Sequence, residues 1–99
     1  MKGNFDSIIN TEQPVLVDFF ADWCQPCQVQ APIIQEVARE LKDKVRVIKI
    51  DVDKNPTIAK KYEIQGVPTL ALFKKGQVVW RQSGLQNKKQ LISIIHSHS

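Results

Sequence analysis

The feature that most constrains the fold of this chain is a change of hydrophobic pattern between residues 15 and 41. Val15–Phe20 is a short apolar run rich in β-forming residues, which is typical of a strand covered on both faces. From Cys24 the apolar residues recur four apart, on a stripe of Val29, Ile33, Val37 and Leu41. We therefore predict a buried strand followed closely by an amphipathic helix.

The same alternation continues to the end of the chain. We predict further strands over residues 45–52, 69–73 and 77–82, and helices over 57–62 and 88–96, with Asn87 as the N-cap of the last helix. The first two strands need a right-handed crossover and should be parallel, whereas the last two are joined by Lys74-Lys75-Gly76 as an antiparallel hairpin. Residues 1–99 should thus form a single α/β domain with a central mixed sheet flanked by helices.

Pro32 lies within the predicted long helix. Because proline lacks a backbone donor and clashes one turn back, we expect it to interrupt or kink the helix near residues 28–32.

Length and charge exclude several classes of function. A chain of 99 residues, 42% hydrophobic, fits one compact core. The net charge of +4 comes from scattered basic pairs, without the clustered stripe and interleaved aromatics of a nucleic-acid site. No apolar run is long enough to span a membrane, and the first residues lack the apolar core of a signal peptide. We therefore expect a cytoplasmic protein that binds neither nucleic acid nor membranes.

Cys24-Gln25-Pro26-Cys27 contains the only two cysteines of the chain. At a helix start, backbone N–H groups and the helix dipole stabilise a thiolate, and a second nearby thiol can resolve a mixed disulfide. The alternative is zinc, which needs four ligands, and the only other soft candidates are His96 and His98 near the C-terminus. The pattern favours redox chemistry over a metal site.

Asp18 and Lys49 are the charged residues within predicted strands that could support such chemistry. Asp18 shares a strand face with Leu16 and Phe20. If it is buried, its pKa should rise toward neutrality, which suits a proton acceptor; otherwise it points outward to solvent. Lys49 alternates with apolar neighbours and, from the pattern alone, points to water.

At this point the chain resembles the thioredoxin family. The resemblance is carried by Trp23-Cys24-Gln25-Pro26-Cys27 and by its flanking residues 17–22, and by residues 31–33, 51–56, 66–70 and 73–76, in order along the chain. It implies the thioredoxin fold, with Cys24 as an exposed nucleophile and Cys27 as a more buried resolving thiol.

The resemblance also assigns roles that the residues alone do not. Asp18 would accept a proton from the resolving cysteine, and Lys49 would modulate the charge of Asp18. Pro68 would follow a cis peptide bond and face the cysteines, leaving the backbone of Val67 free to pair with an extended substrate. A flat patch around the disulfide would dock proteins, formed by Trp23, Gln25, Pro26, Gly66, Val67, Pro68 and Gly84; for each of these, a core or turn role is the alternative.

The chain departs from the family pattern in three places. Only residues 1–4 precede the first helix, so we expect four strands instead of five and an open sheet edge near Lys49. Gln25 stands where the family usually has glycine, and Gln28 replaces a basic residue, both of which bear on the reduction potential. Ser83 replaces an apolar residue beside the docking patch.

The function implied is reduction of disulfides in other proteins, without a bound cofactor, by a monomer that an NADPH-dependent, flavin-containing thioredoxin reductase recycles. Three alternatives stay open: an oxidant or isomerase with a less stable disulfide, a binding module for which redox cycling is incidental, and a glutaredoxin-like use of glutathione.

Overall fold

The computed structural model describes residues 4–99, which form four helices and four strands. In chain order these are α1 (Phe5–Ile9), β1 (Val15–Phe20), α2 (Gln25–Glu40), β2 (Arg46–Asp51), α3 (Pro56–Lys61), β3 (Thr69–Lys74), β4 (Gln77–Ser83) and α4 (Lys88–Ser97). The predicted elements are confirmed to within one or two residues at each end. The expectation that no strand precedes α1 falls on residues 1–3, which lie outside the described part.

The four strands form one mixed sheet in the order β2-β1-β3-β4. β1 and β2 are parallel, while β1 with β3 and β3 with β4 are antiparallel, as the connections predicted. Asp18 lies in the middle of β1, opposite Lys49 of β2 and Leu70 of β3. The sheet therefore places the two charged candidates side by side.

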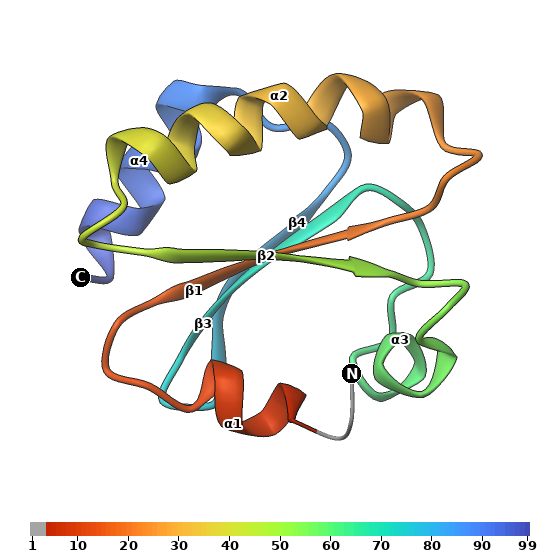
Figure 1. The fold of residues 1–99 in the computed structure, drawn as a ribbon, viewed down its shortest axis with the longest axis horizontal. Coiled ribbons are helices and arrows are strands. Elements are labelled where there is room, and N and C mark those ends of the chain that lie inside the picture. Colours follow the sequence, from red (N-terminus) through yellow and green to blue (C-terminus); the bar gives the residue numbers. More distant parts are fainter. Residues whose placement is uncertain (1–3) are drawn as a thin grey trace.

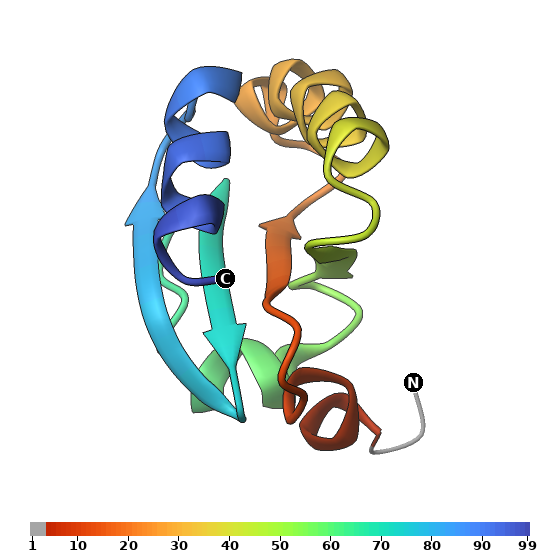
Figure 2. The same cartoon turned by 90° about the vertical axis from the view of Figure 1, so that its left-hand side faces the viewer.

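Helices cover both faces of this sheet. Figure 1 and Figure 2 show α2 and α4 packed over one face, with α1 and α3 over the other. Alternate residues of β1 divide between two cores, so Leu16 packs with α2 and α4 while Val17 and Phe19 pack with α1 and α3. In the described chain, no helix has the length and apolarity that a membrane crossing requires.

Helix α2 corrects two expectations from the sequence. It runs without a break from Gln25 to Glu40 and contains Pro32, so this proline does not interrupt it. The carbonyl that lacks a helical donor because of Pro32 is that of Gln28, and both residues are exposed, so water can bond this carbonyl. Val29 is 49% exposed, although the pattern placed it on the buried stripe.

The exposure of Val29 follows from helix geometry. A spacing of four residues advances about 400°, so each step drifts roughly 40° around the helix, and Val29 lies about 120° from Leu41. The residues that α2 buries instead follow the mixed spacing of three and four: Cys27, Gln30, Ile34 and Val37.

The last helix begins as predicted. The side chain of Asn87 accepts a hydrogen bond from the backbone N–H of Gln90 at 2.8 Å, which caps α4. Trp80 of β4 is partly buried against the core beneath α2 and α4.

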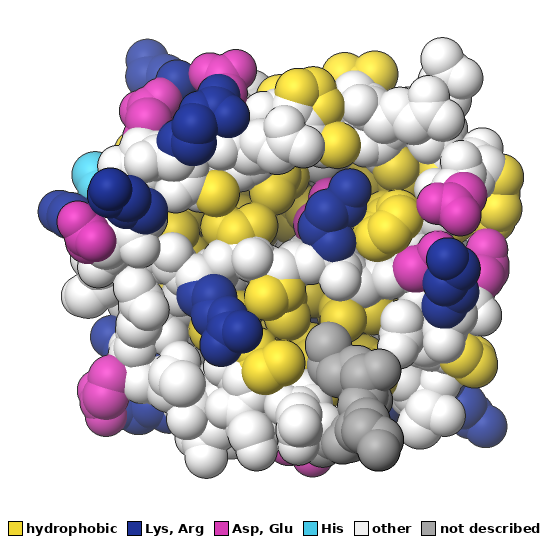
Figure 3. Space-filling view, in the orientation of Figure 1, with side chains coloured by type: hydrophobic (Ala, Val, Ile, Leu, Met, Phe, Trp, Pro, Cys, Tyr) yellow, Lys and Arg dark blue, Asp and Glu magenta, His cyan; other side chains and the backbone are white. Residues whose placement is uncertain are grey.

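Within residues 4–99, β2 pairs with β1 alone, which agrees with the expected open edge near Lys49. Figure 3 shows this side of the molecule: Lys and Arg side chains are scattered over the described surface and do not merge into one basic patch. The dispersed charge matches the pattern seen in the sequence.

Candidate active site

Cys24 and Cys27 form a disulfide at the start of α2, with their Cα atoms 5.3 Å apart. Cys24 is the N-cap residue, and its sulfur accepts a hydrogen bond from the backbone N–H of Cys27 at 3.2 Å. The same N–H and the helix dipole would stabilise a thiolate on Cys24 after reduction. The helix start is thus built to favour the reactive form of this cysteine.

The predicted difference in burial between the two cysteines is wrong for this oxidised form. Cys24 is 3% exposed and Cys27 is 5% exposed. Because the disulfide draws both sulfurs together, they share one small cluster with Ala21, against which Phe20 and Val67 pack. Their order of attack therefore has to be argued from the N-cap position of Cys24 and not from exposure.

Asp18 is fully buried, so the reading in which it points to solvent is wrong. Neither of its carboxyl oxygens has a hydrogen-bond partner within residues 4–99. Burial raises the pKa of Asp18 from 3.8 to about 6, against the opposing effect of the positive charge of Lys49. A carboxyl with this pKa can exchange a proton near neutral pH.

Lys49 is exposed, and it is also placed to act on Asp18. Its ammonium nitrogen lies 4.5 Å from the centroid of the Phe20 ring. Lys49, Cys27 and Gln28 together line a surface pocket of about 190 Å³. The strand register therefore lets this lysine face water and still influence the buried carboxyl.

The peptide bond between Val67 and Pro68 is cis, as the family resemblance implied. Pro68 is buried directly before β3, and Val67 packs against the cysteine cluster. The hydroxyl of Thr69 donates to the carbonyl of Gly66 at 2.6 Å, which closes this turn. The Val67–Pro68 turn thus lies against the disulfide.

The remaining patch residues frame the cysteines. Trp23 is 73% exposed, and its indole N–H donates to the carboxylate of Asp53 at 2.9 Å. Gln25, Pro26, Gly66 and Gly84 are all exposed. Gly84 has a φ of +89°, which other residues rarely adopt, and its N–H donates to the carbonyl of Pro68 at 2.8 Å. A turn role therefore holds for Gly84.

Gly66 differs from Gly84, since a Cβ there would meet no atom within 4 Å and its backbone is not in the left-handed region. Its lack of a side chain leaves open space beside Trp23 and Val67, the residues with which it lines a shallow pocket.

Sequence reasoning missed several residues near this site. It gave no role to Asp53, Leu85, Gln30 or Gln86. Leu85 is 51% exposed, and Gln30 and Gln86 are buried. The sequence did carry a signal for Gln30. It lies three residues after Cys27 and four before Ile34, which is the spacing of the face that α2 buries, so a polar side chain there needs a partner.

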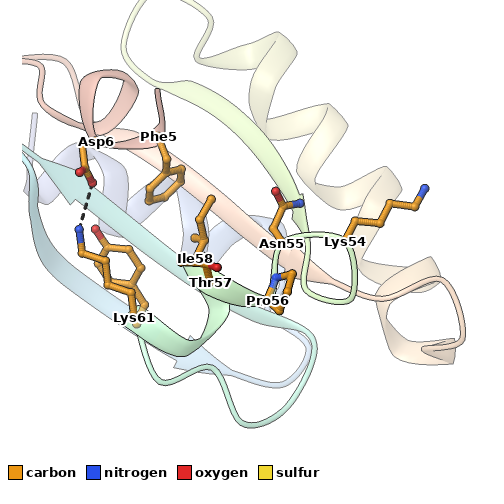
Figure 4. Close-up of a pocket in the computed structure, with 9 residues that line it drawn as sticks. Phe5, Asp6, Lys54, Asn55, Pro56, Thr57, Ile58 and Lys61 are labelled. Atoms are coloured by element: carbon orange, nitrogen blue, oxygen red, sulfur yellow. Dashed lines mark hydrogen bonds and ion pairs between the residues drawn. The ribbon is translucent and has the colours of Figure 1, made fainter. Parts of the chain in front are cut away.

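A cavity of about 390 Å³ lies elsewhere, between α1 and α3 (Figure 4). It is lined by Phe5 and Tyr62, and an ion pair between Lys61 and Asp6 lies at its rim. No cysteine lines this cavity, so its volume does not make it the site of the redox chemistry. Among the described residues, no three His, Cys, Asp or Glu side chains are grouped to hold a metal ion.

A cysteine pair at the start of a helix, with two residues between the cysteines, is joined in a disulfide that can accept two electrons from a partner dithiol. Once reduced to the dithiol, the same pair can pass two electrons to a partner disulfide by thiol–disulfide exchange. On this mixed sheet, the arrangement defines a thiol–disulfide oxidoreductase with the thioredoxin fold.

Comparisons with known proteins agree. Residues 1–97 match the thioredoxin family model. A thioredoxin-like protein of Synechocystis sp. is 51% identical over 91 residues, which cover 91% of this chain and 87% of that protein. A thioredoxin of Rickettsia bellii is 42% identical over 98% of this chain and 92% of its own length.

A plant relative, the chloroplastic thioredoxin Y1 of Arabidopsis thaliana, is 49% identical over 95% of this chain, which corresponds to 57% of the plant protein. The chain belongs to the thioredoxin family.

Proposed function

We propose that this protein reduces disulfides in other proteins, with Cys24 as the nucleophile and Cys27 as the resolving thiol. The observation that carries the proposal is the position of Cys24 as N-cap of α2, where the N–H of Cys27 points at its sulfur. The Cys24 thiolate attacks one sulfur of the substrate disulfide, forming a mixed disulfide and releasing the other sulfur as a thiolate. Cys27 then attacks the sulfur of Cys24, and the second substrate thiol leaves.

Asp18 acts in the second step as the acceptor of the proton that Cys27 must lose. Its burial and its pKa of about 6 support this role. Lys49 acts through Asp18, because its positive charge favours the ionised carboxylate.

Protein substrates dock on the patch around the disulfide. Exposed Trp23, the open space at Gly66 and the Val67–Pro68 turn beside the cysteines support docking of an extended segment. Gln25 and Pro26, exposed between the cysteines, would contact the same segment.

The protein works as a cytoplasmic monomer without a bound cofactor, and an NADPH-dependent thioredoxin reductase returns it to the dithiol form. The family membership supports the need for an external reductant, since each turnover leaves the Cys24–Cys27 pair oxidised.

A redox titration with reduction assays tests the proposal. The Cys24–Cys27 pair should titrate as a reversible two-electron couple at about −270 mV, and the dithiol should reduce insulin. A potential between about −180 and −120 mV would favour an oxidant or isomerase instead. A C27S variant should accumulate mixed disulfides with protein substrates through Cys24, whereas a C24S variant should not.

Replacing both cysteines by serine separates catalysis from binding. Retention of biological activity in that double variant would contradict the enzymatic proposal and favour a binding module.

A further inference from the structure

Helix α2 buries one polar side chain completely, that of Gln30, one turn beyond Cys27. Its amide nitrogen donates to the backbone carbonyl of Gln86 at 3.0 Å, and its amide oxygen accepts from the backbone N–H of Gln86 at 2.8 Å. Gln30 thus bonds both backbone groups of one residue that is 56 positions away in the chain. Both ends of the amide are satisfied, so the pair is a specific connection and not a tolerated buried polar group.

The segment held in this way is residues 84–86, between β4 and α4. Its other end is also fixed, because the N–H of Gly84 donates to the carbonyl of Pro68 at 2.8 Å. The side chain of Gln86 turns back to the carbonyl of Gly84 at 3.2 Å. Between the two fixed points lies Leu85, whose apolar side chain is half exposed.

This clamp connects directly to the redox site. Pro68 follows Val67, which packs on the cluster of Cys24 and Cys27, and Gln30 belongs to the helix that begins at Cys24. The 84–86 segment is therefore tied to both structures that flank the disulfide: the helix on one side and the cis-proline turn on the other.

We propose that Gln30 is a positioning residue that clamps the 84–86 segment to the cysteine-bearing helix, so that Leu85 is presented as an apolar contact for protein substrates. The inference rests on the proposed reduction of protein disulfides and adds a determinant of substrate affinity to it. An exposed leucine whose backbone is fixed on both sides loses little freedom on binding. Without the clamp, the backbone groups of Gln86 would be left buried and unpaired, so the segment would move to hydrate them.

The test compares Q30M with Q35M, a matched change at an exposed position of the same helix. Steady-state kinetics are measured with insulin as the protein disulfide and with hydroxyethyl disulfide as the small one. For Q30M, KM for insulin should rise roughly three- to tenfold, the effect of losing one or two hydrogen bonds, with kcat little changed. The rate with the small disulfide and the reduction potential should stay unchanged, and Q35M should match the parent protein in every measurement.

A Q30E variant supplies a rescue that depends on pH. A protonated carboxyl keeps one donor and one acceptor for Gln86, whereas a carboxylate has only acceptors. The ratio of KM for insulin in Q30E to KM in the parent protein at the same pH should be near one at low pH, where the carboxyl is protonated. This ratio should rise as the carboxyl ionises. Substitution L85S should reproduce the KM effect of Q30M, and the double variant should be no worse than L85S alone.

Hydrogen exchange provides a readout that does not depend on turnover. The amide of Gln86 should be protected in the parent protein and in Q35M, and should exchange faster in Q30M. If the parent protein reduces insulin and Q30M has the same KM for insulin as the parent, the inference is overturned while the proposed function stands. Equal losses with insulin and hydroxyethyl disulfide would also overturn it, since they would place Gln30 in the common chemistry. Failure of the parent protein to reduce insulin would overturn the proposed function and this inference with it.

Discussion

The burial of Asp18 destabilises the folded protein and also gives this carboxyl a pKa that suits proton transfer. Its carboxyl is buried without a hydrogen-bond partner among residues 4–99, so the charged form is unfavourable in the folded protein. The same burial lifts its pKa to about 6, where it can accept and release a proton. A residue retained at this cost to stability is best explained by its chemistry.

The cost of Asp18 predicts a pH dependence of stability. The unfolded carboxyl loses its proton near pH 3.8 and the folded one near pH 6, so the folded state binds more protons between these values and stability falls as pH rises through them. Above both values the loss is constant at about 3 kcal/mol. Substitution D18N should remove this part of the change in unfolding free energy between pH 3.5 and 8, measured by urea denaturation of the oxidised protein.

Comparing the change between the two pH values cancels any fixed effect of burying an amide. D43N, at an exposed position of the loop before β2, should keep the pH dependence of the parent protein. An equal dependence in D18N and the parent protein would contradict the assignment of a raised pKa to Asp18.

Lys49 should lower the pKa of Asp18 through its charge. In K49M, the carboxyl carbon of Asp18, followed by NMR, should titrate at a higher pH than in the parent protein. Since Lys49 is exposed, added salt should screen its effect and raise the midpoint of the parent protein but not that of K49M. A midpoint shared by K49M and the parent protein at low salt would show that this lysine has no electrostatic role.

At the scale of elements, the two valines of α2 show what decides burial on a helix. Val37 is fully buried in the core beneath α2 and α4, whereas Val29, two residues after Cys27, is half exposed. Substitution V37A should lower the free energy of unfolding by about 2 kcal/mol, from two lost methyl groups and the cavity left behind. V29A should change it by less than about 0.5 kcal/mol. Urea denaturation of both variants checks the pair, and similar losses would place Val29 in the core.

The existence of α2 could be predicted because its apolar residues repeat with a helical period, and the position of Cys24 at its start followed from the switch of pattern. The face that α2 buries could not be fixed to a single residue, because both Ile33 and Ile34 fit a stripe. Only the tertiary structure shows that Gln30 is buried and that Val29 is half exposed. The pairing of Gln30 with Gln86 was beyond the sequence, since it joins positions that become neighbours only when β4 and α4 are in place. The near-equal burial of Cys24 and Cys27 in the disulfide was likewise not predicted from the sequence.

At the scale of the whole molecule, the sheet separates two cores with different tasks. The core beneath α2 and α4 and the core beneath α1 and α3 lie on opposite faces of the sheet (Figure 2). Asp18 lies on the first of these faces with Leu16, because side chains alternate along β1. In the second core, the rings of Phe5, Tyr62 and Phe73 meet edge to face, with centroids 5.2 to 5.7 Å apart. This cluster holds α1, which at five residues is too short to be stable alone.

This separation predicts that stability and reduction potential can be changed independently. F5L should lower the free energy of unfolding by roughly 1–3 kcal/mol, because the edge contacts with Tyr62 and Phe73 are lost, whereas Y62F keeps all three rings and should cost less than about 1 kcal/mol.

The reduction potential depends on the difference in stability between the oxidised and reduced forms, in which about 1.4 kcal/mol corresponds to 30 mV. Phe5 lies on the face away from the disulfide, so F5L should destabilise both forms equally and leave the potential unchanged. Denaturation of each form, with a redox titration of the same variant, tests this cancellation; a potential that moves with the lost stability would show that the two cores are coupled across the sheet.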